Sequence, residues 1–181
     1  MKFLAAFLIL TMLSPAVMAQ DNSNWPKPVA TDVESVDAII AALYDVISGP
    51  AGAKRDWDRM RSLFIPEGRL VPTFKNQQGQ VGYRWWSVND YINTAGSNLE
   101  KNGFFEIEIS RKQETYGTIV HLFSTYESRR NEDDPEPFAR GINSIQLMND
   151  GSRWWIVSVF WLGETDDNPI PKTYLKKKKR N

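Results

Sequence analysis

The sequence predicts an α+β domain in which helices gather on one face of an antiparallel sheet. Four long segments, 103–116, 118–130, 138–149 and 153–164, are rich in aromatic and β-branched residues. The gaps between them are too short for crossover helices, so consecutive strands should pair antiparallel as a meander. The helical patterns all lie earlier in the chain, which is typical of the α+β class.

The first helix is predicted from a capping motif and an apolar stripe. Thr31 and Glu34 match the pattern in which both side chains satisfy free amides at a helix start. Gly49 and Pro50 are typical of its end. Apolar residues at spacings of three and four form the stripe between them: Val33, Val36, Ile40, Leu43 and Ile47.

Three further elements are predicted before the meander. Asp56 should cap a shorter second helix, which residues 66–68 end, and residues 69–74 should form a first strand. Residues 80–86 are a short strand or a flap. The run from Ser87 to Asp90 should then cap a third helix that ends near Gly103.

Two motifs and this order of elements resemble a known superfamily. One is Trp57-x-x-Met60-x-x-Leu63-Phe64 running into Pro66-Glu67-Gly68-Arg69, and the other is Asp150-Gly151-x-Arg153-Trp154-x-Ile156. Over residues 31–164 the chain resembles the nuclear transport factor 2-like superfamily. The resemblance implies a cone-shaped, cystatin-like roll in which a strongly bent antiparallel sheet wraps three N-terminal helices. It also implies a pocket between sheet and helices, and homodimers that pair sheet to sheet.

The two ends of the chain indicate an exported protein. Lys2 precedes an apolar run from Phe3 to Leu13, and small residues precede Gln20, so residues 1–19 are a predicted signal peptide. Because the run is shorter than a membrane span, we expect cleavage, no stable span afterwards, and a periplasmic or extracellular location. Residues 20–30 form a flexible leader, residues 31–166 the domain, and residues 167–181 a basic tail. No cysteine is available for lipid attachment or disulfides.

Charge and residue usage exclude several partners. The chain has 22 basic and 22 acidic residues, but five of the positive charges lie at 176–180, which leaves the body without an excess of basic residues. Nucleic acid is therefore not expected as a partner. With no cysteine and one histidine, the sequence offers no recognisable metal motif, and no cofactor is expected.

The pairing of the last two strands sets which side chains share a face. A two-residue turn at Asp150-Gly151 pairs Asn149 with Ser152, and places Asn143 opposite Ser158 and Arg140 opposite Trp161. One face then carries His121, Phe123, Thr125, Glu127, Asn143, Ile145, Trp154, Ile156, Ser158 and Phe160. The other carries Leu122, Ser124, Tyr126, Arg140, Ile142, Trp155, Val157, Val159 and Trp161.

Five residues on these strands are candidates for a ligand site. His121 is the one histidine and could act as an acid or base, or be a satisfied structural residue. Tyr126, Arg140 and Trp161 could clamp an anionic group and stack on an apolar body, or form a structural cation–π pair. Asn143 could orient a ligand or satisfy a bulge. Elsewhere, Glu106 and Glu108 alternate with apolar residues and are expected on the outward face of their strand.

Three functions agree with these observations. The first is binding of a small apolar or anionic ligand in a pocket between sheet and helices, without catalysis. The second is a small-molecule isomerase, dehydratase or hydrolase that uses an acid or base in the pocket. The third is a homodimeric scaffold that pairs through the sheet, which agrees with the seven tryptophans of the chain.

Overall fold

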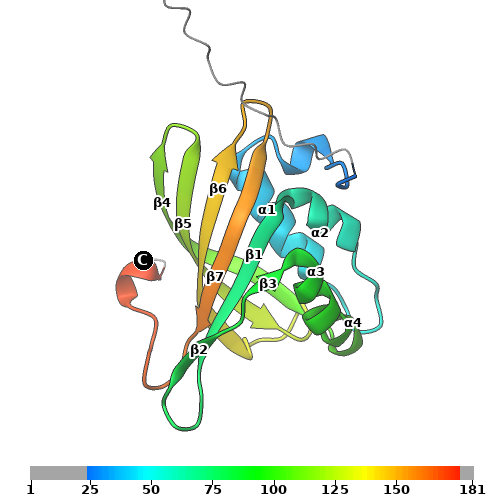
Figure 1. The fold of residues 1–181 in the computed structure, drawn as a ribbon. Helices are drawn as coiled ribbons and strands as arrows, with labels where there is room; N and C mark the ends of the chain where they lie inside the picture. The colour runs from blue at the N-terminus through cyan, green and yellow to red at the C-terminus, as the bar shows by residue number, and fades with distance from the viewer. Residues whose placement is uncertain (1–23, 176–181) are drawn as a thin grey trace, which may run out of the picture.

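Helices cover one side of a strongly curved sheet, and the other side of the sheet is largely open (Figure 1). The computed structural model describes residues 24–175. The predicted signal peptide and the basic run at 176–180 lie outside the described residues. The α+β class predicted from the sequence is confirmed.

The helices occupy the first half of the described chain. They are α1 (Val36–Ile47), α2 (Trp57–Leu63), α3 (Val88–Tyr91) and α4 (Ser97–Asn102), and a π-helical turn η2 (Ile92–Gly96) joins the last two into one continuous helical segment. Short 3₁₀ turns lie at either end of the domain, η1 (Ala30–Asp32) and η3 (Lys172–Tyr174).

The sheet has seven strands. They are β1 (Phe64–Lys75), β2 (Val81–Tyr83), β3 (Trp86–Ser87), β4 (Phe105–Tyr116), β5 (Ile119–Arg129), β6 (Ala139–Asn149) and β7 (Trp154–Gly163). Their order is β2-β1-β7-β6-β5-β4, with β3 paired to β1. The antiparallel meander β4 to β7 is confirmed, whereas β1 pairs with β7 in parallel.

Two of the three predicted helix starts are confirmed. Asp56 accepts a hydrogen bond from the Arg59 amide, and Ser87 forms a reciprocal capping box with Asp90. The helical segment that begins there ends at Gly103, whose φ of 71° requires glycine or a strained residue.

The predicted cap of the first helix is wrong. Helix α1 begins at Val36, where Ser35 accepts a hydrogen bond from the Ala38 amide, and residues 30–32 form η1 instead. The physical reason is tertiary, because the Asp32 carboxylate pairs with Arg59 at 2.7 Å and the Val33 carbonyl accepts from the Trp154 amide. These contacts hold the chain before residue 35 out of the helix.

The predicted pairing of β6 with β7 is also wrong. Asn149 pairs with Trp154 across a four-residue turn in which the Asp150 carboxylate accepts from the amides of Ser152 and Arg153. A bulge between Gln146 and Leu147 then shifts the register, so that Asn143 lies opposite Trp161. The predicted position of Asn143 relative to β5 is wrong as well. Asn143 pairs with Ser124 and does not share a face with His121.

The corrected register gives the sheet an inner and an outer face. Because directly paired residues share a face, Asn143 and Ile145 lie with Ser124 and Leu122, on the side that meets the helices. The core forms there around α1. Its fully buried members include Ile39, Ile40, Met60, Leu63, Phe64, Leu122, Ile145, Leu147 and Ile156.

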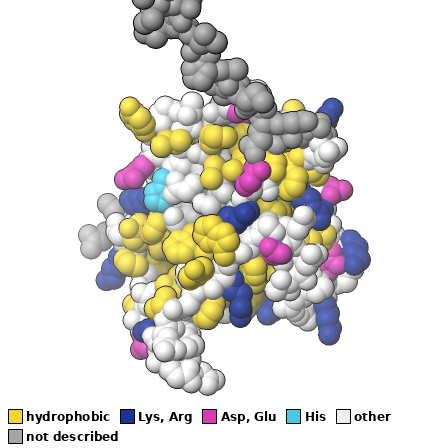
Figure 2. Space-filling model, viewed as in Figure 1, with side chains coloured by type: hydrophobic (Ala, Val, Ile, Leu, Met, Phe, Trp, Pro, Cys, Tyr) yellow, Lys and Arg dark blue, Asp and Glu magenta, His cyan; other side chains and the backbone are white. Residues whose placement is uncertain are grey.

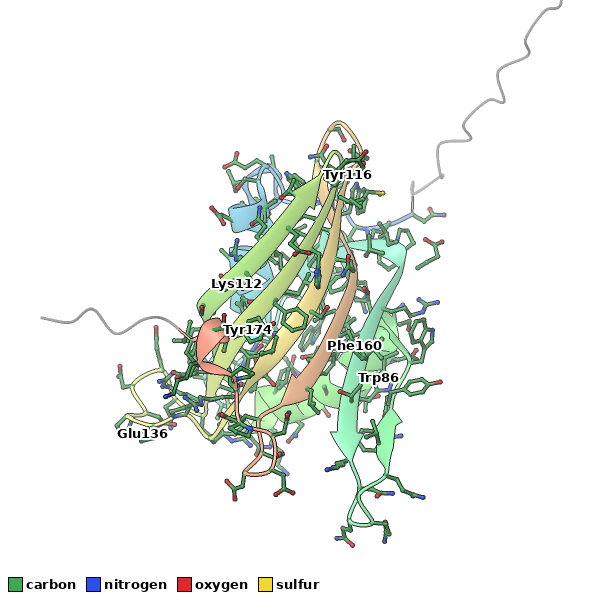
Figure 3. All side chains as sticks on the ribbon, turned by 90° about the vertical axis from the view of Figure 1, so that its left-hand side faces the viewer. Trp86, Lys112, Tyr116, Glu136, Phe160 and Tyr174 are labelled. Atoms are coloured by element: carbon green, nitrogen blue, oxygen red, sulfur yellow. The ribbon has the colours of Figure 1, made fainter. Side chains whose placement is uncertain are left out.

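Both ends of the described chain pack against the domain. The Trp25 indole donates hydrogen bonds to the Arg61 and Phe64 carbonyls. Past residue 166, where the sequence placed the start of the tail, Ile170 is buried, and the Tyr174 ring lies 5.4 Å from that of Phe123 on the outer face of β5 (Figure 3). Ile170 and Tyr174 therefore pack against the domain.

Candidate functional site

A cavity of about 360 Å³ lies between the inner face of the sheet and the helices. Its wall is mainly apolar and aromatic, with Tyr91 in edge-to-face contact with both Trp86 and Trp161. The lining residues with polar side-chain groups other than the tryptophans are Tyr44, Tyr91, Glu106, Tyr126, Ser128 and Asn143. Such a wall is typical of sites for small organic molecules.

Glu106 is the one lining residue of the cavity with a carboxyl group. It comes from the start of β4, which is fixed to the end of α1 by several hydrogen bonds. Phe104 and Gly49 exchange both backbone bonds, and the Glu106 amide donates to the Ser48 hydroxyl at 3.0 Å. The position of the carboxyl group is therefore set by the contact between the end of α1 and the edge strand β4.

Burial raises the pKa of Glu106 from 4.5 to about 7. Two donors oppose this rise because they stabilise the charged form: the Ser128 hydroxyl at 2.8 Å and the Asn143 amide nitrogen at 3.5 Å. The lining of the cavity contains no lysine, arginine or histidine. Glu106 thus changes its charge near neutral pH without a cationic partner in the cavity wall.

Two phenol groups in the cavity have free hydrogen-bonding capacity. Burial raises the pKa of Tyr91 and of Tyr126, so both hydroxyls stay protonated. Within residues 24–175, neither hydroxyl has a hydrogen-bond partner, and no fully buried side-chain oxygen or nitrogen lacks one. Both hydroxyls therefore reach accessible space. The Tyr126 ring has room because the residue opposite it is Gly141. A side chain at position 141 would clash with the phenol oxygen.

The structure brings together three of the five residues singled out from the sequence. Tyr126, Asn143 and Trp161 all line the cavity. Arg140 lies on the outer face, where its guanidinium pairs with Glu164 at 2.7 Å.

His121 also lies on the outer face. Its Nε2 is 3.0 Å from the Ser144 hydroxyl, and its ring packs on Phe123. His121 is therefore not a neighbour of the cavity carboxyl.

Sequence reasoning missed Glu106 and placed it, with Glu108, on the outward face, which is wrong. The pairing of β4 with β5 sets Glu106 opposite Ser128 and Glu108 opposite Tyr126, on the inner face, while Ile107 is half exposed. The sequence of the neighbouring strand β5 contained a signal for a buried polar face. Ser124, Tyr126 and Ser128 share one parity with Leu122, which indicates a buried face that already carries polar groups.

Two observations bear on metals and membranes. Between residues 24 and 175, no group of three or more His, Cys, Asp or Glu side chains is arranged to hold a metal ion. Over the same part of the chain, every helix is too short or too polar to cross a bilayer.

Comparison with solved structures identifies the fold. A protein of unknown function with a cystatin-like fold from Nostoc punctiforme aligns with a TM-score of 0.54 at 10% identity, over 72% of this chain and 90% of that one. A putative calcium/calmodulin-dependent protein kinase II association domain from Xanthomonas campestris aligns with a TM-score of 0.51 at 14% identity, over 74% and 91%. A nuclear transport factor 2-like superfamily protein from Salmonella enterica aligns with a TM-score of 0.50 at 16% identity, over 70% and 87%.

These likenesses show the fold class. The chain has the cone-shaped α+β fold of nuclear transport factor 2-like and cystatin-like proteins, as the sequence predicted. No profile of a known protein family matches the chain, and no curated protein matches its sequence. A fold of this kind hosts many functions, so the chemistry of the cavity, not the fold, indicates the function.

Proposed function

We propose that this protein binds a small, neutral, mostly apolar molecule that carries a hydrogen-bonding group. The observation that carries the proposal is the single carboxyl group of Glu106 in a cavity whose wall is mainly apolar and aromatic. An anionic ligand is disfavoured, because its charge would lie near Glu106 with no basic side chain in the lining. The apolar wall supplies affinity, and the free phenols and Glu106 supply orientation.

Calorimetric titration with 2-naphthol tests this proposal. The probe is neutral, apolar and small enough for a cavity of about 360 Å³, and we expect a Kd on the order of 10⁻⁴ M. Replacing Ala95, which lines the cavity, by Phe should fill it and weaken binding by at least about tenfold.

The matched control is Ala51→Phe, which adds the same side chain at an exposed turn and should leave the affinity unchanged. Circular dichroism establishes that both variants are folded. If wild type shows no heat of binding at millimolar probe, or if Ala95→Phe binds as well as wild type, the cavity is not a ligand site.

Proton transfer is a second candidate function. It is favoured by a carboxyl group whose pKa lies near 7, since a general base works best near the ambient pH. In such a reaction the ionised Glu106 would remove a proton from a bound molecule, and the protonated phenols of Tyr91 and Tyr126 would donate to an oxygen that gains charge. The discriminating measurement is a proton abstraction whose rate follows the ionisation of Glu106.

We also propose that two copies pair through the outer face of the sheet. Large apolar side chains remain exposed there on β7, on β2 and in the loop after β2, and Figure 2 shows apolar side chains gathered on that side of the molecule. Phe160 and Leu162 are 49% and 43% exposed, and Trp85 is 64% exposed.

Light scattering at micromolar concentration should report the mass of a dimer. Phe160→Lys should shift the mass to that of a monomer, because a charge would enter the buried interface. Tyr116→Lys adds the same charge to the outer face at the opposite edge of the sheet, on β4 and away from the apolar patch, and should leave the dimer intact. A monomer mass for wild type would contradict the pairing.

A further inference from the structure

A continuous chain of hydrogen bonds links the cavity to an ion pair outside it. The Asn143 amide nitrogen donates to the Tyr44 hydroxyl at 3.1 Å, and the Tyr44 and Ser124 hydroxyls are 2.7 Å apart. Ser124 then donates to the Glu108 carboxylate. Asn143, Tyr44 and Ser124 are buried, while Glu108 lines a groove between α1 and β4 that shares Tyr44 and Glu106 with the cavity.

Arg111 makes the Glu108 carboxylate, the last group in this series of hydrogen bonds, an obligatory acceptor. Its guanidinium bonds both Glu108 oxygens, at 2.9 and 3.0 Å from Nε and 2.7 Å from Nη2, and it also bonds Asp37 at 2.6 Å. A carboxylate in this ion pair can only accept hydrogen bonds. Ser124 must therefore donate to Glu108, and its own oxygen is left to accept from Tyr44.

The hydrogen bond from Tyr44 to Ser124 fixes the orientation of Asn143. Because the Tyr44 proton is committed to Ser124, the Tyr44 oxygen can only accept from Asn143, so the amide nitrogen must face Tyr44 and Glu106. The carbonyl oxygen of Asn143 has no partner among the described residues. Since no fully buried polar atom there lacks a partner, that oxygen reaches accessible space, which at this residue is the cavity.

We propose that Ser124, Glu108 and Arg111 are positioning residues: through Tyr44 they hold the Asn143 carbonyl oxygen toward the cavity, which therefore selects ligands that donate a hydroxyl proton. The first part concerns the unliganded protein, and the selection of ligands rests on the proposed binding function. If a substitution at Ser124 or Glu108 breaks this series of hydrogen bonds, Tyr44 can donate to Asn143. The side-chain amide of Asn143 can then flip by about 180°. Glu106 then loses the Asn143 donor.

Carboxyl titration by NMR tests the positioning in the unliganded protein. Ser124→Ala and Glu108→Gln should each raise the pKa of Glu106 by at least about half a unit, because its charged form loses a donor. Removal of the Glu108 charge by itself would lower the pKa of Glu106 in Glu108→Gln. Loss of the Asn143 donor would raise it, so the direction of the shift distinguishes the two effects. The hydroxyls of Tyr44, Tyr91, Tyr126 and Ser128 also face Glu106, and Arg111 and Arg129 line the groove that Glu106 shares with Glu108. These side chains are all unchanged in Glu108→Gln.

Two variants serve as controls for this titration. Ser124→Thr keeps the hydroxyl and should retain the wild-type pKa of Glu106. Glu114→Gln makes the same replacement on the same strand at a carboxylate that is 88% exposed and outside the chain of bonds, and it should have no effect. An unchanged or lowered Glu106 pKa in Glu108→Gln or in folded Ser124→Ala would overturn the positioning role.

Probe selectivity tests the consequence for ligands. Wild type should bind 2-naphthol about tenfold more tightly than 2-methoxynaphthalene, which can only accept. In Ser124→Ala this ratio should fall by at least about fivefold, and Ser124→Thr should restore it. If the ratio of the two affinities is unchanged in Ser124→Ala, Asn143 does not select hydroxyl donors. The carboxyl titration then still tests whether Ser124 and Glu108 position Asn143. If wild type binds neither naphthalene, the proposed binding function and the selection both fail, and the titration separates that result from a failure of positioning.

Discussion

Replacing Glu106 by glutamine is expected to stabilise the protein at pH 8 and to leave its stability near pH 4 unchanged. The folded protein holds this carboxyl proton up to about pH 7, whereas the unfolded chain releases it near 4.5. Between these values the folded state binds more protons, so the free energy of unfolding falls as the pH rises. The contribution is fully present below 4.5 and is lost as the pH passes 7.

The expected size of this effect is about 3 kcal/mol at most, from a pKa difference of roughly 2.5 units. Glutamine has nearly the same shape but no charge, so it removes the penalty for the buried carboxylate at high pH. Its amide can still accept from or donate to Ser128, the partner that Glu106 has at 2.8 Å.

Denaturant unfolding at intervals from pH 4 to pH 8 measures the difference. The stability of wild type relative to the variant should decline between about pH 4.5 and 7 and then level off. Glu114→Gln, at an exposed carboxylate, should follow the wild-type curve. A constant difference between Glu106→Gln and wild type across this range would show that Glu106 has an ordinary pKa in the folded protein.

Local sequence signals predicted most of the fold. The caps at Asp56 and Ser87 and the apolar stripe of α1 are set by neighbours within one or two turns of helix, and the structure confirms them. The meander was predictable because three short turns join four segments of high β propensity. The parallel pairing of β1 with β7 joins segments more than 80 residues apart, and no local pattern indicates it.

The inner face was not predictable, because it depends on single-residue offsets. The bulge between Gln146 and Leu147 shifts the pairing of β6 with β7 by one residue. Because side chains alternate between the two faces of a strand, this shift puts Asn143, and not Arg140, on the same face as Trp161. Strand β4 posed the same problem, since alternation of acidic and apolar residues normally places the acids outward. At Glu106 and Glu108 the acids lie inward because Asn143, Ser124 and Ser128 provide buried partners from distant strands. Arg111, three residues further along β4, pairs with Glu108.

5-Nitrobenzisoxazole is expected to lose its carbon-bound proton faster in the presence of this protein than in buffer. The Glu106 carboxylate takes the proton while the ring nitrogen–oxygen bond breaks, which gives a coloured cyanophenolate, and Glu106 then returns the proton to water. The probe is neutral and apolar, so the cavity should accept it, and desolvation strengthens the carboxylate as a base.

The pH dependence and one variant identify the base. The protein-dependent rate should rise with pH, reach half its maximum near pH 7 and level off above it, because only ionised Glu106 can accept the proton. Glu106→Gln should lower this rate by at least about 100-fold, the usual contribution of a general base. Glu114→Gln should react as wild type does. A rate equal to that of buffer, or one that persists in Glu106→Gln, would exclude Glu106 as a base and leave binding alone as the function of the cavity.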